Sequence, residues 1–459
     1  MIIVKTTKSK IVKGEEDFAR TIAIYRQACS FAIRVVLDNW GAISGQPDSH
    51  LRQQAAERLM IPTRNRDVDL VNNFSAAFYK FPSYLRRQVF TKAIGDVSSH
   101  MIRLVQWREL KAATEAKGKK FKAEPPTLND RHNGFPVFYW KNMFQGDLRE
   151  GLAGGNVNLL IKVYRNNDWV WREITVDGRS LKNRGISTFE PQAPAIVKRH
   201  GGHFLHVPWQ GEAKLPSLGD MDGVRVCSAD LNLGCDAVCV ALKSDGTVLS
   251  RRFFRHDREK DLLYKATGRV AEANRESGIG PKPKLWRRLT GLNDEIARRV
   301  ARQIVNFAAE NDCHVVVLEN LSRMQATGSR RKKVHLWRKR TIARLVEAMA
   351  HELGMRFSLV NPKNTSKLAF DGSGEASRPL PGKLLAFRSG KLYNADLNAA
   401  YNIAARWVVR TLFSRLSKKQ QEELRAKAPE FVPGPCTTLS TLVTGWMRQS
   451  PGGTCFACR

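Results

Sequence analysis

Hydrophobic and polar positions divide the chain into segments of different periodicity. Residues 2–12 alternate between apolar and polar side chains, which predicts a β-strand, whereas helical periodicity runs from about Glu15 to Trp40. A second long helix is predicted to begin near Pro82 and Ser83. Its apolar stripe, typical of a helix-bundle core, comprises Leu85, Val89, Ile94, Val97, Met101 and Leu104. The Lys- and Pro-rich string KAATEAKGKKFKAEPP then predicts a linker.

Short strand-like segments replace the helical pattern between about Arg131 and Pro216. They read PVFYW, NVNLLIKVY, WVWREITV and HFLHVPW, and turn-rich strings such as RNND and GG separate them, which predicts a small β-barrel or sandwich. The strand at residues 2–12 precedes the helices, so we expect it to pair into this β domain, with the helices inserted after it. A domain boundary is predicted near residues 215–223.

A different order of elements begins at Val224. VRVCSAD is a predicted strand, and DAVCVALKSDGTVLSRRFF predicts a hairpin that turns at Asp245 and Gly246. Basic helical segments continue to about Glu310. HVVVLE then predicts a buried strand, TIARLVEAMAHELG a helix closed by Gly354, MRFSLV a strand and ADLNAAYNIAARWVV a helix. Three antiparallel strands followed by helices that alternate with two more strands is the order of an RNase H-like fold.

Composition adds the class of partner to this picture. With 459 residues and 42% hydrophobic content, the chain can bury several cores in two or three lobes. Lys and Arg number 76 against 43 Asp and Glu, which gives a net charge of +33 spread over the whole chain. A solvated basic surface is the alternative, but self-repulsion opposes compaction and phosphates would neutralise it. The charge therefore favours nucleic acid as the partner.

Membrane, secretion and zinc signals are weak or missing in the sequence. The longest apolar stretches are short and the start, MIIVKTTKSK, has no signal-peptide pattern, so we expect no membrane association and a cytoplasmic, nucleoid-associated prokaryotic protein. Among the eight cysteines only Cys455 and Cys458 form a CxxC pair. A structural zinc site needs four ligands, so zinc is not expected.

Three acidic residues occupy special places in the predicted order of elements. Asp230 ends the first strand after Val224, Glu319 ends the fourth, and Asp396 opens the last helix. Singly, each is better explained as an exposed strand-end or helix-capping acid. Together they can reach one cleft, where hydrolysis of a phosphodiester needs cations that activate water and stabilise the leaving oxyanion. Carboxylates suit Mg²⁺ or Mn²⁺, and without a cation three converging negative charges would repel.

A basic run at residues 329–340, SRRKKVHLWRKR, follows Glu319 in sequence. Cationic side chains around an aromatic ring can bind phosphates and stack on a base, so this run is predicted to line a nucleic-acid channel. The alternatives are a basic loop or a localisation-like signal. The candidate contacts are Arg330, Arg331, Lys332, Lys333, Trp337, Arg338 and Arg340. RRFFRHDREK and PKPKLWRRL are similar, less specific runs.

The strings around the three acids resemble a known family. CSADLNLG, VVVLENLSRM and NADLNAAYNIAAR look like the three RuvC motifs of TnpB-like nucleases and compact type V CRISPR effectors, and the resemblance extends over roughly residues 222–410. It implies an RNA-guided DNA endonuclease with one RuvC site, in which Asp230, Glu319 and Asp396 hold Mg²⁺ and a guide RNA pairs with target DNA as a heteroduplex. A guide-dependent binding protein that represses transcription stays open, as does a guide-independent nuclease or recombinase.

The resemblance also implies a fold class, α/β plus α+β multidomain, with an RNase H-like RuvC domain, a β-barrel wedge domain and an inserted helical recognition lobe. The implied ranges are 1–14 for the first wedge strand, 15–130 for the lobe, 131–218 for the wedge, 222–410 for RuvC and 411–459 for an extension without an assigned role. One departure concerns the zinc ribbon, expected at about 366–392. Ala369, Ala386 and Ser389 stand roughly where its cysteine ligands would be.

Overall fold

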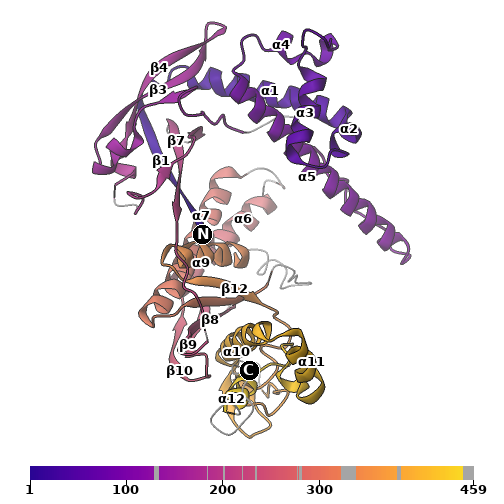
Figure 1. Cartoon of the computed structure of the whole chain (residues 1–459), viewed down its shortest axis with the longest axis vertical. Coiled ribbons are helices and arrows are strands. Elements are labelled where there is room, and N and C mark those ends of the chain that lie inside the picture. The colour runs from indigo at the N-terminus through magenta and orange to yellow at the C-terminus, as the bar shows by residue number, and fades with distance from the viewer. Residues whose placement is uncertain are drawn as a thin grey trace. The chain divides into compact units, whose positions relative to one another are not determined.

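The computed structural model describes residues 1–128, 134–182, 185–199, 202–219, 221–232, 235–276, 278, 282–321, 338–379 and 384–447 (Figure 1). The chain divides into two compact units, Ile2–Glu212 and Ala213–Arg459, the second of which also includes Met1. Both units combine helices with sheets, so the predicted mixed α/β, multidomain class is confirmed. Within the described ranges, every helix is too short or too polar to cross a membrane.

Helices of the first unit follow its first strand. They are α1 (Phe18–Asp38), α2 (Trp40–Ser44), α3 (Ser49–Met60), η1 (Leu70–Asn72), α4 (Phe74–Ala77) and α5 (Ser83–Glu115). The long helices α1 and α5 pack together, and the buried residues of α5 are Leu85, Val89, Phe90, Ala93, Val97 and His100. Ile94 and Met101 are partly buried against the same core, so the predicted stripe is confirmed as far as Met101, and Ile102, Val105 and Leu110, which the helix exposes, lie outside it.

One largely antiparallel sheet forms the rest of this unit. Its strands are β1 (Ile2–Lys13), β2 (Phe144–Gln145), β3 (Asn156–Arg165), β4 (Asp168–Asp177), β5 (Glu190–Pro191), β6 (Ala195–Arg199) and β7 (Gly202–Glu212), with η2 (Leu148–Ala153) and η3 (Gly178–Ser180) between them. The order is β2-β3-β4-β1-β7-β5, and β6 pairs with β7. The first strand therefore lies inside a sheet whose other strands follow the helices.

The predicted strand at PVFYW is wrong. The segment forms only isolated bridges, from Val137 to Ala195 and from Trp140 to Phe144, and the amide of Phe138 donates to the Pro194 carbonyl oxygen at 2.8 Å. Pro136 has no N–H to donate, so this segment cannot continue a ladder of strand hydrogen bonds. Tyr139 and Trp140 are exposed instead of packing as alternate strand residues.

A five-stranded sheet organises the second unit. Its strands are β8 (Arg225–Leu231), β9 (Ala237–Lys243), β10 (Val248–Phe254), β11 (Val315–Glu319) and β12 (Arg356–Val360), in the order β10-β9-β8-β11-β12. The first three are antiparallel, and β11 runs parallel to both β8 and β12. The predicted hairpin turn contains Gly246 at a φ of +93°, a conformation that glycine adopts without strain.

Helices cover both faces of this sheet. They are α6 (Asp257–Glu276), α7 (Pro283–Glu310), α9 (Lys339–Glu352), α10 (Ala395–Arg415), α11 (Lys418–Lys427), η5 (Pro429–Phe431) and α12 (Leu439–Met447). Cys227, Ala229 and Leu318 share a core with α7 and α9, whereas Val226 and Val317 share one with α10. Because alternate strand residues point to opposite faces, the sheet has an α7/α9 face and an α10 face.

A short hairpin precedes α10 at the place of the expected ribbon. Its strands are β13 (Leu384–Ala386) and β14 (Leu392–Asn394), and a small core of Ala369, Leu385, Phe387 and Ala395 lies beneath it. Of the three positions expected to have carried ligands, Ala369 is in this core, Ala386 is in β13 and the Ser389 hydroxyl donates to Asp371 at 2.6 Å. Apolar packing thus holds the described part of the hairpin.

The segment after α10 packs back onto that helix. The amide of Leu439 donates to the Asn402 side chain at 3.2 Å, and the amide of Ser440 donates to the Phe370 carbonyl oxygen at 2.8 Å. In Figure 1 α11 and α12 lie together with α10. Cys455 and Cys458 lie outside the described residues.

Candidate active site

Asp230 and Glu319 lie side by side at the ends of two parallel strands. The register of β8 and β11 places Ala229 opposite Leu318, so the next positions along the two strands are Asp230 and Glu319. Neighbouring strands are about 4.8 Å apart, and residues in the same register point to the same face. Both acids therefore project on the α10 face, at the carboxyl end of the parallel strands.

Asp396 approaches from the first turn of α10. The side chain of Asn394 caps this helix, because its Oδ1 accepts hydrogen bonds of 3.0 Å from the amides of Asp396 and Leu397. The helix is fixed to β8 by the hydroxyl of Ser228, which donates to the Ala400 carbonyl oxygen at 2.7 Å. The N-terminal turn of α10 is thus anchored against the strand that carries Asp230.

The three carboxylates act on one another electrostatically. The pKa of Asp230 is well above its ordinary value, first because of burial and then because of the negative charges of Glu319 and Asp396, although a hydrogen bond with Asn232 opposes the shift. Burial also raises the pKa of Glu319, against a hydrogen bond from Thr365 and the charge of Arg406. Oδ2 of Asp396 is buried without a hydrogen-bond partner among the described residues.

Two observations bear on whether a metal ion fits here. Across the described ranges, no group of three or more His, Cys, Asp or Glu side chains is arranged to hold a metal ion. The donors themselves have the right chemistry, because carboxylate oxygens are the ligands that Mg²⁺ and Mn²⁺ prefer. The carboxylate oxygen of Asp396 that has no hydrogen-bond partner lies beside two acids whose pKa values are raised. A divalent cation bound here would stabilise the ionised form of these carboxylates.

A cationic pocket of about 200 Å³ opens beside Glu319. Lys339, Arg340 and Arg344 of α9 line it, together with Glu319, Glu347 and apolar side chains that include Leu231 and Phe357. Its three cationic side chains outnumber its two carboxylates, so the lining has a small excess of positive charge. Arg340 is the one predicted nucleic-acid contact in this lining, and Arg338 pairs with Asp294 at 3.3 Å. The other predicted contacts, Arg330, Arg331, Lys332, Lys333 and Trp337, lie outside the described residues.

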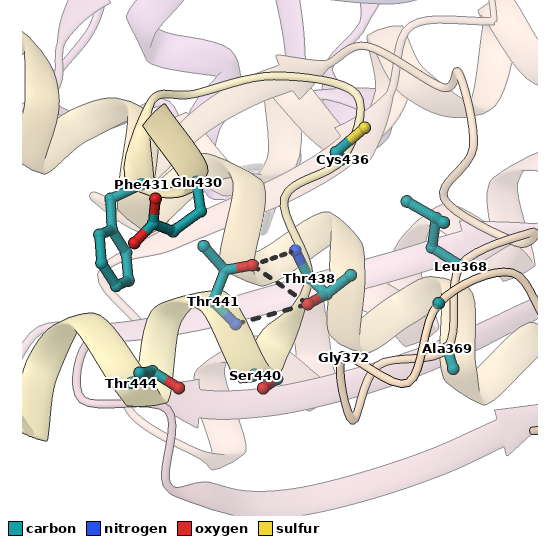
Figure 2. Close-up of a pocket in the computed structure, with 11 residues that line it drawn as sticks. Leu368, Ala369, Gly372, Glu430, Phe431, Cys436, Thr438, Ser440, Thr441 and Thr444 are labelled. Atoms are coloured by element: carbon teal, nitrogen blue, oxygen red, sulfur yellow. Dashed lines mark hydrogen bonds between the residues drawn. The ribbon is translucent and has the colours of Figure 1, made fainter. Parts of the chain in front are cut away.

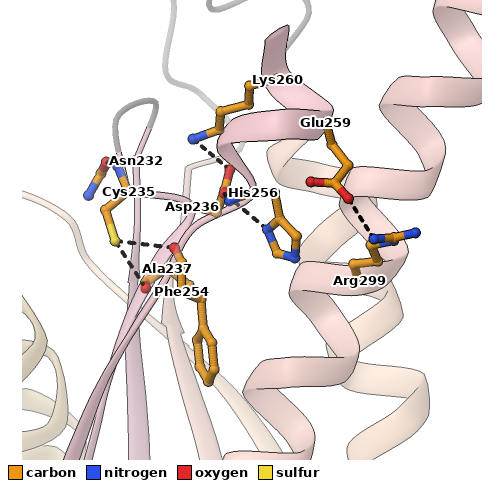
Figure 3. A network of polar contacts seen from close by, with 9 residues as sticks. All are labelled: Asn232, Cys235, Asp236, Ala237, Phe254, His256, Glu259, Lys260 and Arg299. Atoms are coloured by element: carbon orange, nitrogen blue, oxygen red, sulfur yellow. Dashed lines mark hydrogen bonds and ion pairs between the residues drawn. The ribbon is translucent and has the colours of Figure 1, made fainter. Parts of the chain in front are cut away.

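The sequence did not indicate a buried polar network near the same end of β8 (Figure 3). Asp236, just before β9, accepts a 2.8 Å hydrogen bond from the amide of His256 and forms an ion pair of 2.9 Å with Lys260. Burial raises the pKa of Asp236, but the contacts with His256 and Lys260 outweigh it and the net pKa is lowered. The run RHDREK had signalled only basic charge, whereas the network ties β9 and β10 to α6.

Arg406 is a second residue that the sequence did not single out. It is buried in α10, and its guanidinium donates to the carbonyl oxygens of Asn361, Lys363, Pro435 and Thr437. Its charge also favours the ionised form of Glu319. One cation therefore links the loop after β12, the C-terminal segment and the carboxylate end of the sheet.

A larger pocket, of about 400 Å³, lies between the residue 368–374 loop and the C-terminal segment (Figure 2). Hydroxyl and apolar side chains line it, and the amides and hydroxyls of Thr438 and Thr441 bond to one another at 3.2–3.4 Å. Glu430 is the one ionised side chain in its described lining. This pocket therefore lacks the cationic character of the pocket beside Glu319.

Comparisons with known proteins identify proteins that are similar to this chain. The Aq_aa04 family model matches residues 5–165. TnpB-like protein aq_aa05 of Aquifex aeolicus (strain VF5) is 25% identical over 233 residues, which are 45% of this chain and 74% of that protein.

Solved structures give weaker likenesses. The Cas12f1-sgRNA-target DNA complex is 15% identical, with a TM-score of 0.42 over 88% of this chain and 99% of that one. The mini-RNA-guided endonuclease CRISPR-Cas_phi3 is 11% identical, with a TM-score of 0.47 over 89% and 92%. The sequence match, by contrast, confirms the resemblance that the three motifs indicated: over the part that it covers, this chain is similar to a TnpB-like protein.

Proposed function

We propose that the chain is a divalent-metal-dependent DNA endonuclease that is directed by a guide RNA and cuts in a single RuvC site. The observation that carries the proposal is the approach of Asp230, Glu319 and Asp396 to one another on the α10 face, where burial and then the charges of the other two raise the pKa of Asp230. The strand order β10-β9-β8-β11-β12 supports an RNase H-like fold for this unit. The sheet of β1–β7 would then be the wedge and α1–α5 the recognition lobe.

The three carboxylates would hold Mg²⁺ or Mn²⁺, which supplies an activated water and stabilises the leaving oxyanion in phosphodiester hydrolysis. The protein's own groups prepare the site. Thr365 donates a hydrogen bond to Glu319, and Arg406 favours the ionised form of that carboxylate. The Asn394 cap fixes the turn that presents Asp396. These contacts hold the acids ready to bind a cation.

Guide RNA and target DNA are the proposed partners. A net charge of +33 supports binding to polyanions, and the similarity to a TnpB-like protein supports this family of activities. In RNA-guided recognition the protein holds an RNA–DNA heteroduplex by its backbone, and base pairing selects the sequence. The cationic pocket beside Glu319 would accept a phosphate of the bound strand.

The test uses the full chain purified with its bound RNA, which is sequenced to define the target. Wild-type complex should cut a supercoiled target plasmid in Mg²⁺, whereas Asp230→Ala should leave it uncut and still bind target DNA in a guide-dependent manner. The loss follows from removing one of the three cation ligands. Undiminished cutting by Asp230→Ala would rule out the proposed site, and the absence of a discrete bound RNA would rule out the guide.

A second candidate is a guide-dependent DNA-binding protein that represses transcription. The observation in its favour is that the three acids do not form a metal-holding group in the described structure. The ribbon positions without cysteine, such as Ala369, agree with it. The same assay separates the candidates, because a binding protein would retain the plasmid in a stable complex and leave it supercoiled at every Mg²⁺ or Mn²⁺ concentration.

A further inference from the structure

The edge strand β10 presents two side chains in line with the carboxylates. Across the sheet Phe253 is paired with Val238, and Val238 is paired with Asp230. In the next row on the same face, Arg251 is paired with Val240 and Val240 with Ser228. Both side chains therefore project on the α10 face. Two strand spacings put the backbone of Phe253 roughly 10 Å from that of Asp230.

These two positions are accessible to a ligand. Phe253 is 46% exposed, although a phenylalanine on a strand is ordinarily packed against a core. Arg251 is also exposed. The strand ends the sheet order, and among the described residues no other strand pairs with its outer edge. An aromatic ring and a guanidinium thus stand at an open edge beside three acids.

The neighbouring residue, Arg252, has a structural role on this strand and serves as a comparison for Arg251. Arg252 points to the α7/α9 face, where it pairs with Glu310 at 2.7 Å and lies over the ring of Phe307 at 5.4 Å from its centroid. An ion pair and a cation–π contact account for that side chain. Arg251 has no carboxylate partner within the described part of the chain.

Two tyrosines instead lie near Arg251 on the carboxylate side. An interaction with the side chain of Tyr401 of α10, and then one with Tyr393, raises the pKa of Arg251. The two phenol oxygens lie 3.3 Å apart, so they form one acceptor surface between α10 and β14. A guanidinium has five N–H donors in a planar fork, so contact with neutral phenols leaves its charge and further donors for a phosphate.

We infer that Arg251 and Phe253 form a subsite for the DNA strand next to the scissile phosphate, in which Arg251 binds a backbone phosphate and Phe253 stacks on a base. This inference rests on the proposed function and extends it to residues outside the carboxylate site. The physical need is clear, because three acids repel the phosphates they act on, and a cation held nearby offsets that repulsion. Stacking on an aromatic ring fixes a single strand without sequence preference.

Cleavage kinetics of the full chain with its bound RNA test the subsite. Arg251→Ala and Phe253→Ala should each lower the cleavage rate at least fivefold, because one base stack or phosphate contact is lost, with target affinity unchanged since the heteroduplex supplies it. Arg251→Lys should restore part of the rate. Arg252→Ala, the matched control, should cut as the wild type does. Wild-type rates in both test variants would overturn the inference, as would rates that fall only in step with thermal stability.

Crosslinking separates this inference from the proposed function. DNA single strands carrying 4-thiothymidine are bound to the RNA-loaded Asp230→Ala chain, irradiated and mapped by mass spectrometry. We expect a crosslink at Phe253 that disappears in the Asp230→Ala, Phe253→Ala double variant. Crosslinks confined to other segments would overturn the subsite even if the wild type cuts. A crosslink at Phe253 in a chain whose wild type never cuts would uphold the subsite and sink the proposed cleavage.

Discussion

The two faces of the five-stranded sheet are built from the same strands but differ in chemistry. On the α7/α9 face, Cys227, Ala229 and Leu318 are buried among apolar side chains. On the α10 face the alternate positions include Ser228 and Asp230. A one-residue change of position along β8 thus separates an apolar core from a second apolar core that also contains buried polar groups.

The polar groups of the α10 face are matched almost one to one. Asn398 and Asn402 of α10 each donate to the Leu368 carbonyl oxygen at 2.9 Å, and each accepts a backbone amide, from Phe370 and Leu439 respectively. Buried polar groups are ordinarily paired in this way. Within the described ranges, the unpartnered carboxylate oxygen of Asp396 is an exception at the acid end. The difference between the two faces teaches that the α10 face positions polar groups. It leaves without a partner the Asp396 oxygen that would bind a cation.

The largest predicted effect is a loss of stability when the polar contacts of the α10 face are removed. Arg406→Met should lower the free energy of unfolding by roughly 4 kcal/mol, because several buried carbonyl oxygens lose their donor at once. Chemical denaturation of the full chain measures it. Arg252→Ala is the control, since its half-exposed ion pair is worth under about 1 kcal/mol. Equal stabilities of the two variants would show that the Arg406 contacts contribute little.

A smaller effect is expected on the apolar face. Leu318→Ala should cost about 3 kcal/mol, because it empties a fully buried site in the core beneath α7 and α9. It should leave binding of divalent cations unchanged, since alternation turns this side chain away from the carboxylates. Denaturation and metal titration of one preparation check both parts. A variant that loses cation binding while still folded would contradict the separation of the two faces.

The smallest effect concerns pH and the Asp236 network. Asp236→Asn should cost about 2 kcal/mol at neutral pH, because hydrogen bonds to a charged group are lost. The folded pKa of Asp236 lies below the ordinary value of 3.8, so its contribution is present above that pH and is lost as the pH falls through the folded pKa. Stability curves of wild type and variant should therefore converge below about pH 3.8. A constant gap at all pH values would contradict a charge-based role.

Much of the carboxylate end could be predicted from the sequence. Apolar runs such as HVVVLE predict buried strands, and the sequence pattern places Glu319 and Asp230 at the ends of two of them. The polar network of α10 could not be predicted, because Asn398, Asn402 and Arg406 look like a solvated helix face. Their partners are carbonyl oxygens and amides from residues 361–370 and 435–439, which only folding brings together.

The face of Arg251 was equally hidden. The pairing of β10 with β9 shifts register between Val248 and Ser250, and such an irregularity reverses the face of every later side chain relative to simple alternation from the turn. The sequence RRFF alone does not show that Arg251 and Arg252 have different roles. The register and the partners Tyr401 and Glu310 separate their roles.

Direct measurement of Mn²⁺ binding tests the central claim that the three carboxylates form a cation site. Electron paramagnetic resonance of the full chain should show bound Mn²⁺ in the wild type, competed by Mg²⁺, and markedly less in Asp230→Ala, Glu319→Ala and Asp396→Ala. Leu318→Ala should bind as the wild type does. Mn²⁺ binding that is equal in the wild type and all three carboxylate variants, or undetectable in every one of them, would contradict the account.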